Sequence, residues 1–284
     1  MILERINKTI QEYKLLEKKD RILIAYSGGV DSTGLLKLLL ELREGWSFEL
    51  FLGHFNHKLR HTADEDEQFV KRMAQKYSLP IFVGSKDVRS YARAKKLNIE
   101  EAGRKLRYDF LKKAALKIGG AKIATGHTKT DQAETFLMRL MRGSGLRGLA
   151  GIFPLVEGTI IRPLIQVEHK DIEAYLKGKG IEFRIDESNL DRRFLRNRIR
   201  LDLIPYIQEN FEPEIVSSLG RIASIIREED SLLEKIAQET TKKAISKKNN
   251  QISLEVKPLS SLPRAMARRV VRGREEREIG RAHV

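Results

Sequence analysis

The chain has 284 residues, of which 41% are hydrophobic, enough to bury a sizeable core in one large domain with a smaller one beside it. It has no cysteine, which excludes disulfide frameworks, thiolate metal sites, iron–sulfur clusters and catalytic thiols built from this chain. The formal net charge of +15 favours a polyanionic partner such as nucleic acid, although a generally basic, solvated surface would give the same total.

The N-terminal segment, residues 1–20, mixes apolar and charged residues in the pattern of an amphipathic helix. It lacks the uninterrupted apolar stretch of a signal peptide or a membrane span. We therefore expect a cytoplasmic protein without a membrane partner.

From residue 21 onward, short apolar runs alternate with segments of helical period. The runs typical of strands are residues 21–26, 48–54, 81–83 and 122–125, and the helical segments are 33–40, 63–77, 88–96, 100–118 and 129–141. This alternation predicts the α/β class, with a Rossmann-like parallel sheet covered by helices on both faces. Ligands of such sheets bind beyond the carboxyl ends of the strands.

The pattern becomes less regular after residue 141. A Gly-rich stretch at 143–148 predicts a flexible loop, and a helix is expected at 168–179. We expect the first domain to close near Pro205, so that residues 1–205 form one domain.

The remainder is predicted to be smaller and mainly helical. Residues 206–248 read as a helical connector, with one long helix or a helical pair at 214–246. Residues 249–284 read as a partial C-terminal region, with a strand at 251–256 and an arginine-rich helix after Pro263. Its last residues, 278–284, resemble the translation of a sequencing-adapter fragment and are a candidate non-native tail; an ordinary frayed basic terminus is the alternative.

One short motif joins the first predicted strand to the next helix. Its residues are Ser27, Gly28, Gly29, Val30, Asp31 and Ser32. The glycines let the backbone approach an anion, and the amides of the turn and of the helix N-terminus point towards it. The two serines add hydroxyl donors, whereas Asp31 would repel phosphate unless Mg²⁺ lay between them. An ordinary capped helix start explains a Gly-Gly turn, but it does not explain two serines and an acid in this order.

This motif resembles the signature of the PP-loop (N-type) ATP pyrophosphatases, whose loop holds the pyrophosphate of ATP while AMP is transferred. It is not a Walker loop, which would place a lysine before its Ser/Thr. The resemblance implies ATP and Mg²⁺ as cofactors and adenylylation as the half-reaction. It leaves the acceptor open.

Four further motifs narrow the acceptor. They are GHFNHKLR at 53–60, EAGRKLRY at 101–108, TGHTKTDQAET at 125–135 and RNRIR at 196–200. Together with the loop they closely resemble the tRNA(Ile)-lysidine synthase family over residues 20–205. The resemblance implies an ATP-dependent ligase in which the wobble cytosine of tRNA(Ile) with a CAU anticodon is adenylylated. Free L-lysine then displaces AMP and gives lysidine. An anticodon loop presents such a base unpaired. The resemblance further implies that residues 1–205 form the ATP-binding catalytic domain and that residues 249–284 are part of a C-terminal region that binds tRNA.

The resemblance also implies a role for each candidate residue. It implies catalysis by Asp31, His54, Arg107 and Asp131, Mg²⁺ binding by Asp31 and Asp131, ATP binding by residues 27–32 with Gly126 and His127, and substrate or tRNA contacts by His57, Arg104, Glu134, Arg196, Arg198 and Arg200. Arg107 is expected at the reacting phosphate, and Asp131 is expected to help deprotonate the lysine ammonium.

Each of these residues also has a structural interpretation. A pair of histidines is more often structural than functional, and Arg104 and Arg107, three residues apart, can pair with nearby glutamates. Asp131 and Glu134 suit the dipole of a helix start, and the three arginines at 196–200 can be a solvated charge run.

Three rival functions remain. A PP-loop tRNA thiolase generally needs a persulfide-carrying cysteine or a cluster, and an amidotransferase synthetase needs a cysteine nucleophile, so the lack of cysteine disfavours both. A nucleotide-gated RNA-binding module would keep RNA binding after Asp31→Ala, whereas an enzyme would lose turnover. The oligomeric state stays open, with a homodimer as one candidate.

Overall fold

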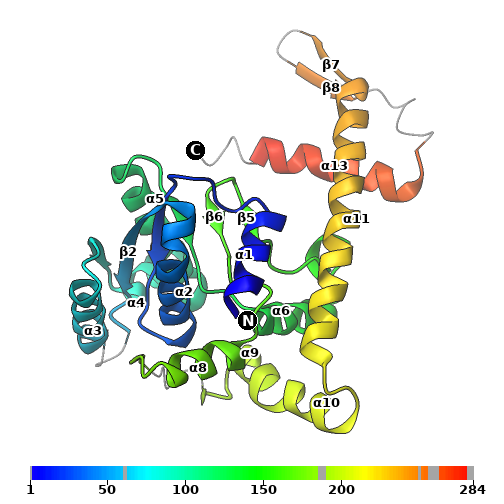
Figure 1. Cartoon of the computed structure of the whole chain (residues 1–284). Coiled ribbons are helices and arrows are strands. Elements are labelled where there is room, and N and C mark those ends of the chain that lie inside the picture. Colours follow the sequence, from blue (N-terminus) through cyan, green and yellow to red (C-terminus); the bar gives the residue numbers. More distant parts are fainter. Residues whose placement is uncertain (1, 60–62, 185–189, 249–250, 255–261, 280–284) are drawn as a thin grey trace.

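The computed structural model describes residues 2–59, 63–184, 190–248, 251–254 and 262–279, with backbone only for 242–248, 251–254 and 272–279. A six-stranded sheet runs through its centre in the order β3-β2-β1-β4-β6-β5 (Figure 1). The strands are β1 (Arg21–Ala25), β2 (Glu49–Asn56), β3 (Ile81–Ser85), β4 (Lys122–Ala124), β5 (Leu155–Val156) and β6 (Ile160–Ile161). All neighbours pair in parallel except β5, which pairs antiparallel with β6 at the edge.

Helices cover both faces of this sheet, which confirms the predicted fold class. The helices that pack on one face are α1 (Ile2–Glu12), α2 (Val30–Trp46), α3 (Ala63–Lys76) and α8 (His169–Gly178), and α5 (Ile99–Lys117), with α4 (Val88–Lys95) beside it, packs on the other. Each predicted strand and helix up to residue 141 is present, and most ends lie within two residues of the prediction. The first helix is shorter than expected from residues 1–20, because it ends at Glu12, and α2 extends to Trp46, beyond the predicted residue 40.

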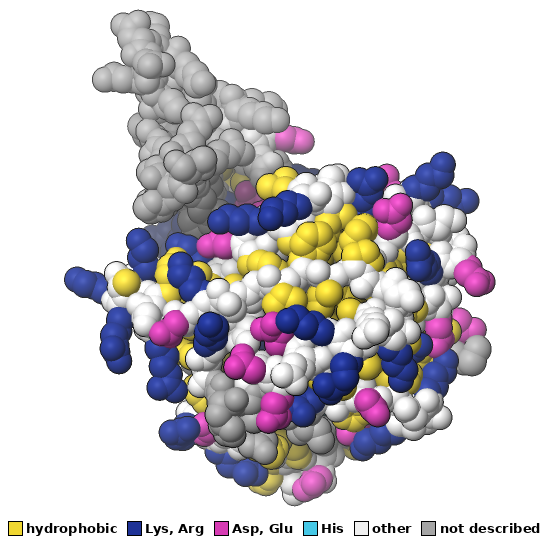
Figure 2. All heavy atoms as spheres, turned by 90° about the vertical axis from the view of Figure 1, so that its left-hand side faces the viewer, with side chains coloured by type: hydrophobic (Ala, Val, Ile, Leu, Met, Phe, Trp, Pro, Cys, Tyr) yellow, Lys and Arg dark blue, Asp and Glu magenta, His cyan; other side chains and the backbone are white. Residues whose placement is uncertain are grey.

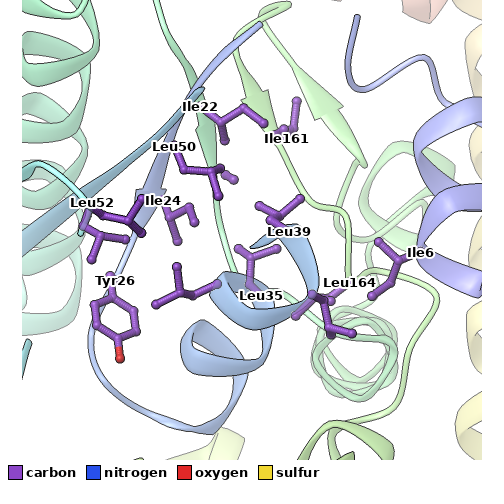
Figure 3. Packing of buried hydrophobic residues seen from close by; sticks show 14 of the residues in the cluster. Ile6, Ile22, Ile24, Tyr26, Leu35, Leu39, Leu50, Leu52, Ile161 and Leu164 are labelled. Atoms are coloured by element: carbon purple, nitrogen blue, oxygen red, sulfur yellow. The ribbon is translucent and has the colours of Figure 1, made fainter. Parts of the chain in front are cut away.

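The core follows the alternation of side chains along β1. Ile22 and Ile24 lie with Leu35 and Leu39 of α2 in the larger apolar cluster (Figure 3). Leu23, between them in sequence, belongs to the cluster on the opposite face, formed with α5. A strand that is apolar on both sides is typical of a central parallel strand, because both of its faces are buried.

Between residues 141 and 168, one prediction was wrong and one element was not predicted. The stretch 143–148 is not entirely a loop, because the short helix α7 (Leu146–Leu149) starts within it. The hairpin β5–β6 was not predicted, because strands of two residues show no periodicity. It extends the sheet beyond β4, and its turn contains Gly158 with φ +66°.

A third group of helices packs against α6 (Lys129–Met141). It comprises α9 (Leu195–Arg198), the π-helical turn η2 (Ile199–Leu203), α10 (Ile204–Asn210) and α11 (Ile215–Ala244). Pro205 lies in the first turn of α10, where a missing amide hydrogen is tolerated. The division of the chain near Pro205 stays a prediction.

The stretch at 214–246, predicted as one long helix or a helical pair, is a single helix, α11, which ends at Ala244. Residues 245–248, expected to belong to the helical connector, form a strand instead. A small antiparallel hairpin, β7 (Ile245–Lys248) and β8 (Gln251–Leu254), stands at its far end, and α13 (Arg264–Ile279) crosses α11 (Figure 1). Arg269 of α13 donates to buried Asp230 of α11 at 2.6 Å, which ties the two helices together. The predicted strand end at 255–256 and residues 280–284 of the candidate tail lie outside the described residues.

Basic side chains are spread over the face shown in Figure 2 and are interrupted by acidic and apolar ones. The positive charge is therefore not gathered into one continuous patch on that face. Among the described helices, none combines the length and apolar character needed to cross a bilayer.

Candidate functional site

The predicted phosphate loop lies at the carboxyl end of β1 and leads into α2. Gly28 adopts φ +85°, and a Cβ there would lie 2.9 Å from the Phe69 ring, so both the turn and the packing require glycine. The Ser27 and Ser32 hydroxyls lie 3.1 Å apart across the loop. The first amides of α2 have no acceptor within the helix and remain available to an anion.

Asp31 lies in the first turn of α2, and the structure surrounds it with two other elements. Its Oδ1 accepts a hydrogen bond of 2.7 Å from Nδ1 of His169, the first residue of α8. Gly126, after β4, packs on its backbone, and a Cβ there would lie 3.0 Å from the Asp31 carbonyl carbon. Burial raises the pKa of Asp31, and the hydrogen bond from His169 opposes this shift.

His54 lies near the end of β2, with its side chain buried. Its Nδ1 lies 3.0 Å from the carbonyl oxygen of Tyr26; because a carbonyl only accepts, Nδ1 carries the proton. Burial lowers the pKa of His54, so the ring is neutral at neutral pH. The buried Nε2 has no hydrogen-bond partner among the described residues and can accept one from a ligand.

His127 follows β4 and is also neutral. Its Nδ1 accepts from Thr125 Oγ1 at 2.8 Å and from Arg162 Nε at 3.3 Å. Burial, opposed by Asp131 and reinforced by Arg162 and Arg107, lowers the pKa of His127 to about 3. The ring proton therefore lies on Nε2, which can donate to a ligand.

Two guanidinium groups lie near this histidine. That of Arg162 is buried, and that of Arg107 is half-buried. Desolvation lowers the pKa of each, and neither forms an ion pair with a carboxylate in the part of the chain that the structure describes. Buried cations are normally paired, so an unpaired set is typical of an anion site. The glutamate pairing that the sequence left open for Arg107 is not formed.

Arg104 lies on α5, and His57 packs against the same helix. The guanidinium of Arg104 is exposed and stacks at 5.7 Å on the ring of Tyr108, which Arg107 approaches at 5.6 Å. His57 packs edge-on against Phe55 and lies against Gly103 of α5, where a Cβ would be 3.3 Å from its Nδ1.

Two buried acids, Asp131 and Glu134, and two half-buried arginines, Arg196 and Arg200, form one cluster, which we call the ion quartet. Arg196 donates to Asp131 Oδ1 at 2.8 Å and to Glu134 Oε2 at 2.7 Å, and Arg200 contacts the same two carboxylates. Since the formal charges cancel, these two arginines do not by themselves present a basic surface. Arg198, between them in sequence, is exposed and has no ion pair among the described residues.

The two acids of the ion quartet differ in their electrostatics. Burial raises the pKa of Glu134, whose side chain has no exposed surface. Burial acts in the same direction on Asp131, but the positive charges of Arg196 and Arg200 outweigh it and lower the pKa of Asp131. Asp131 Oδ2 also accepts from the Thr128 amide at 2.8 Å, completing a capping box at the start of α6. Asp131 therefore has the structural role at the helix start that the sequence allowed, in addition to its ion pairs.

Comparison with known proteins gives the family. Residues 2–207 match the model of the PP-loop domain. The chain belongs to the PP-loop family. It is 40% identical over 272 residues to the tRNA(Ile)-lysidine synthase of Caldanaerobacter subterraneus subsp. tengcongensis, covering 95% of this chain and 58% of that protein. The corresponding protein of Clostridium acetobutylicum is 38% identical over 273 residues, covering 96% and 59%. The chain therefore spans about three fifths of the length of these curated relatives.

A solved structure of the same fold is the U34-tRNA thiolase NcsA of Methanococcus maripaludis with its [4Fe-4S] cluster. It superposes with a TM-score of 0.66 over 79% of each chain at 15% identity, which shows a shared fold alone. The present chain has no cysteine with which to hold such a cluster.

Three residues of this PP-loop site were not predicted from the sequence: His169, Arg162 and Arg184. The Arg184 amide donates to Gly28 O at 2.8 Å, and its guanidinium binds Asp66 and Glu65 of α3. Each of the three is far from the loop in sequence and lies outside the motifs, so only the fold brings it to the site. Arg162 lies in the stretch after residue 141 where the sequence pattern is irregular, and that stretch gives no local signal for a functional residue.

The residues present fit ATP with Mg²⁺. Asp131 lies close enough to Asp31 for its charge to help raise the pKa of Asp31, while no cluster of three or more metal-ligating side chains occurs among the described residues. Mg²⁺ characteristically takes one or two carboxylates and completes its shell with phosphate oxygens and water. Because Asp131 is already shared with two arginines, Asp31 is the better placed of the two predicted ligands.

Proposed function

We propose that this chain carries the catalytic part of a tRNA(Ile)-lysidine synthase, a ligase that joins free L-lysine to the wobble cytidine of tRNA(Ile) with a CAU anticodon. The observation that carries the proposal is the 40% identity over 95% of the chain to a relative of that name, which extends through the loop, the ion quartet and α11. The net charge of +15 suits an RNA substrate.

In the first half-reaction, oxygen O2 of the cytosine attacks the α-phosphate of ATP and pyrophosphate leaves. The loop amides and the Ser27 and Ser32 hydroxyls would hold the departing phosphates. Arg107 and Arg162 would face the α-phosphate, where a fixed guanidinium stabilises the charge that develops. Bound Mg²⁺, held by Asp31, would neutralise phosphate charge.

In the second half-reaction, the ε-ammonium group of lysine first loses a proton, and the free amine nitrogen then bonds to carbon 2 of the cytosine. The bond from carbon 2 to the former O2 breaks, and AMP leaves with that oxygen. Asp131 remains our candidate for orienting this amine, but its lowered pKa makes it a weak proton acceptor. We therefore assign it charge stabilisation of the incoming ammonium, with proton loss to solvent, in place of the stronger base role predicted from the sequence.

Contacts with tRNA are assigned to the exposed cations beside the site. Arg198 and Arg104 are both exposed and lack ion pairs among the described residues, so phosphate contacts cost them no existing partner. Glu134, Arg196 and Arg200 are assigned to the wall of the site, and His57 to packing against Gly103 of α5. The reaction is placed in the cytoplasm, and a homodimer remains one candidate assembly.

Transfer of labelled lysine tests the function. With ATP, Mg²⁺ and radiolabelled lysine, the chain is expected to label tRNA(Ile)(CAU) but not the methionine tRNA, and Asp31→Ala is expected to lower labelling by at least about a hundredfold. The relative from Caldanaerobacter subterraneus serves as the positive control. If that control labels tRNA(Ile) and the present chain does not, the proposal fails for this chain. If Asp31→Ala labels tRNA normally, the site is misassigned.

A further inference from the structure

His169 and Asp31 form a contact that the proposed chemistry does not yet use. Nδ1 of His169 lies 2.7 Å from Oδ1 of Asp31, although the residues are 138 positions apart, and both side chains are largely covered. No other hydrogen bond to the Asp31 carboxylate occurs among the described residues, so Oδ2 is left for another ligand. The His169 amide also donates to Thr130 Oγ1 at 3.1 Å, which anchors the residue to the start of α6.

The packing of α2 against α8 sets this distance. Gly34 lies one turn after Asp31 on α2, and Ile172 lies one turn after His169 on α8. A Cβ on Gly34 would lie 2.2 Å from Cγ2 of Ile172, so only glycine permits this approach of the two helices. Because residues i and i+3 share a helix face, the same close approach brings the preceding pair, Asp31 and His169, together. The contact is therefore built into the helix packing and is not a chance surface pair.

We propose that His169 is the positioning residue for Asp31: by donating to Oδ1 it fixes the carboxylate so that Oδ2 faces the cation bound with ATP. A ligating carboxylate is commonly oriented by such a partner, whose removal weakens metal binding by about ten- to a hundredfold. Neither the loop motif nor the matched family model assigns His169 a role. The inference rests on the ATP and Mg²⁺ part of the proposed function and not on lysine or tRNA as substrates.

The test compares two replacements of His169 in the whole chain. His169→Leu removes the donor at similar volume, whereas the side-chain amide of His169→Asn places a donor near the former Nδ1. The measurement is the Mg²⁺ concentration that half-saturates binding of a non-hydrolysable ATP analogue, followed by titration calorimetry, with unfolding midpoints recorded in parallel. Lys170→Ala, an exposed neighbour on α8, is the matched control.

We expect His169→Leu to raise the half-saturating Mg²⁺ concentration by about tenfold, and His169→Asn to raise it by less than about threefold. The unfolding midpoints of the two variants should agree. Unchanged Mg²⁺ dependence in His169→Leu would overturn the proposal, and so would an equal loss in both variants. Because no tRNA is present, failure of lysine transfer with this Mg²⁺ result intact would refute the proposed acceptor and leave the role of His169 standing.

Discussion

Arg107→Met is expected to lower the rate of tRNA-dependent AMP release by about 10²–10³-fold, the loss usual when one preorganised donor to a developing anionic charge is removed. The free energy of unfolding should stay the same or rise. The guanidinium is desolvated and has no carboxylate partner among the described residues, so the ring of Tyr108 offsets only a small part of the cost of burying its charge in the apo protein. Activity is measured by single-turnover kinetics and stability by urea unfolding.

Two further variants sharpen this prediction. Lys113→Met removes an exposed cation from the same helix and should leave both quantities unchanged. Arg107→Lys keeps the charge but loses the planar fork, and should recover only part of the rate. Arg107 would prove to be structural if the methionine variant were markedly less stable while a correctly folded fraction turned over normally.

Glu134→Gln is expected to lower the free energy of unfolding by about 2–3 kcal/mol, because it breaks a buried ion pair on one side only. The loss lies at the lower end of the usual range, since the side chains of Arg196 and Arg200 are 36% and 24% exposed and solvent screens them. Equilibrium urea unfolding measures the change. Glu173→Gln on α8, which breaks an exposed pair with Lys177, should cost less than about 0.5 kcal/mol.

The double variant Glu134→Gln/Arg200→Gln tests the cause of that loss. Removing one carboxylate and one guanidinium together restores the charge balance of the ion quartet, so the double variant should be more stable than the sum of the two single changes predicts. Strict additivity would show that the quartet does not act as a coupled unit.

The sequence predicted the parallel sheet well because its signal is local. A strand such as β1 is a continuous apolar run, and its helix follows at once with a glycine turn between them. The two-residue strands β5 and β6 carry no such signal. The sequence also allows α11 to be one helix or two. Its apolar spacing continues through residues 215–244, and only tertiary contacts decide whether the helix bends.

The candidate site divides in the same way. The loop and the acids of α6 could be found as motifs, but their partners could not, because hydrogen bonds such as Asp31 to His169 join positions far apart in the chain. The sequence also could not show that Arg196 and Arg200 are neutralised by Asp131 and Glu134. Because Arg196 and Arg200 already pair with carboxylates, we expect phosphate to be contacted by Arg107, Arg162 and the exposed Arg198 instead.

The fate of the wobble oxygen tests the central claim most directly. A tRNA(Ile)(CAU) whose wobble cytosine carries ¹⁸O at O2 is incubated with this chain, ATP, Mg²⁺ and lysine. The mass of the AMP formed is then measured by mass spectrometry. Attack of O2 on the α-phosphate followed by displacement by lysine predicts one ¹⁸O atom in each AMP and none in the modified base. Unlabelled AMP, or formation of ADP and phosphate in its place, would contradict activation of the base by adenylylation.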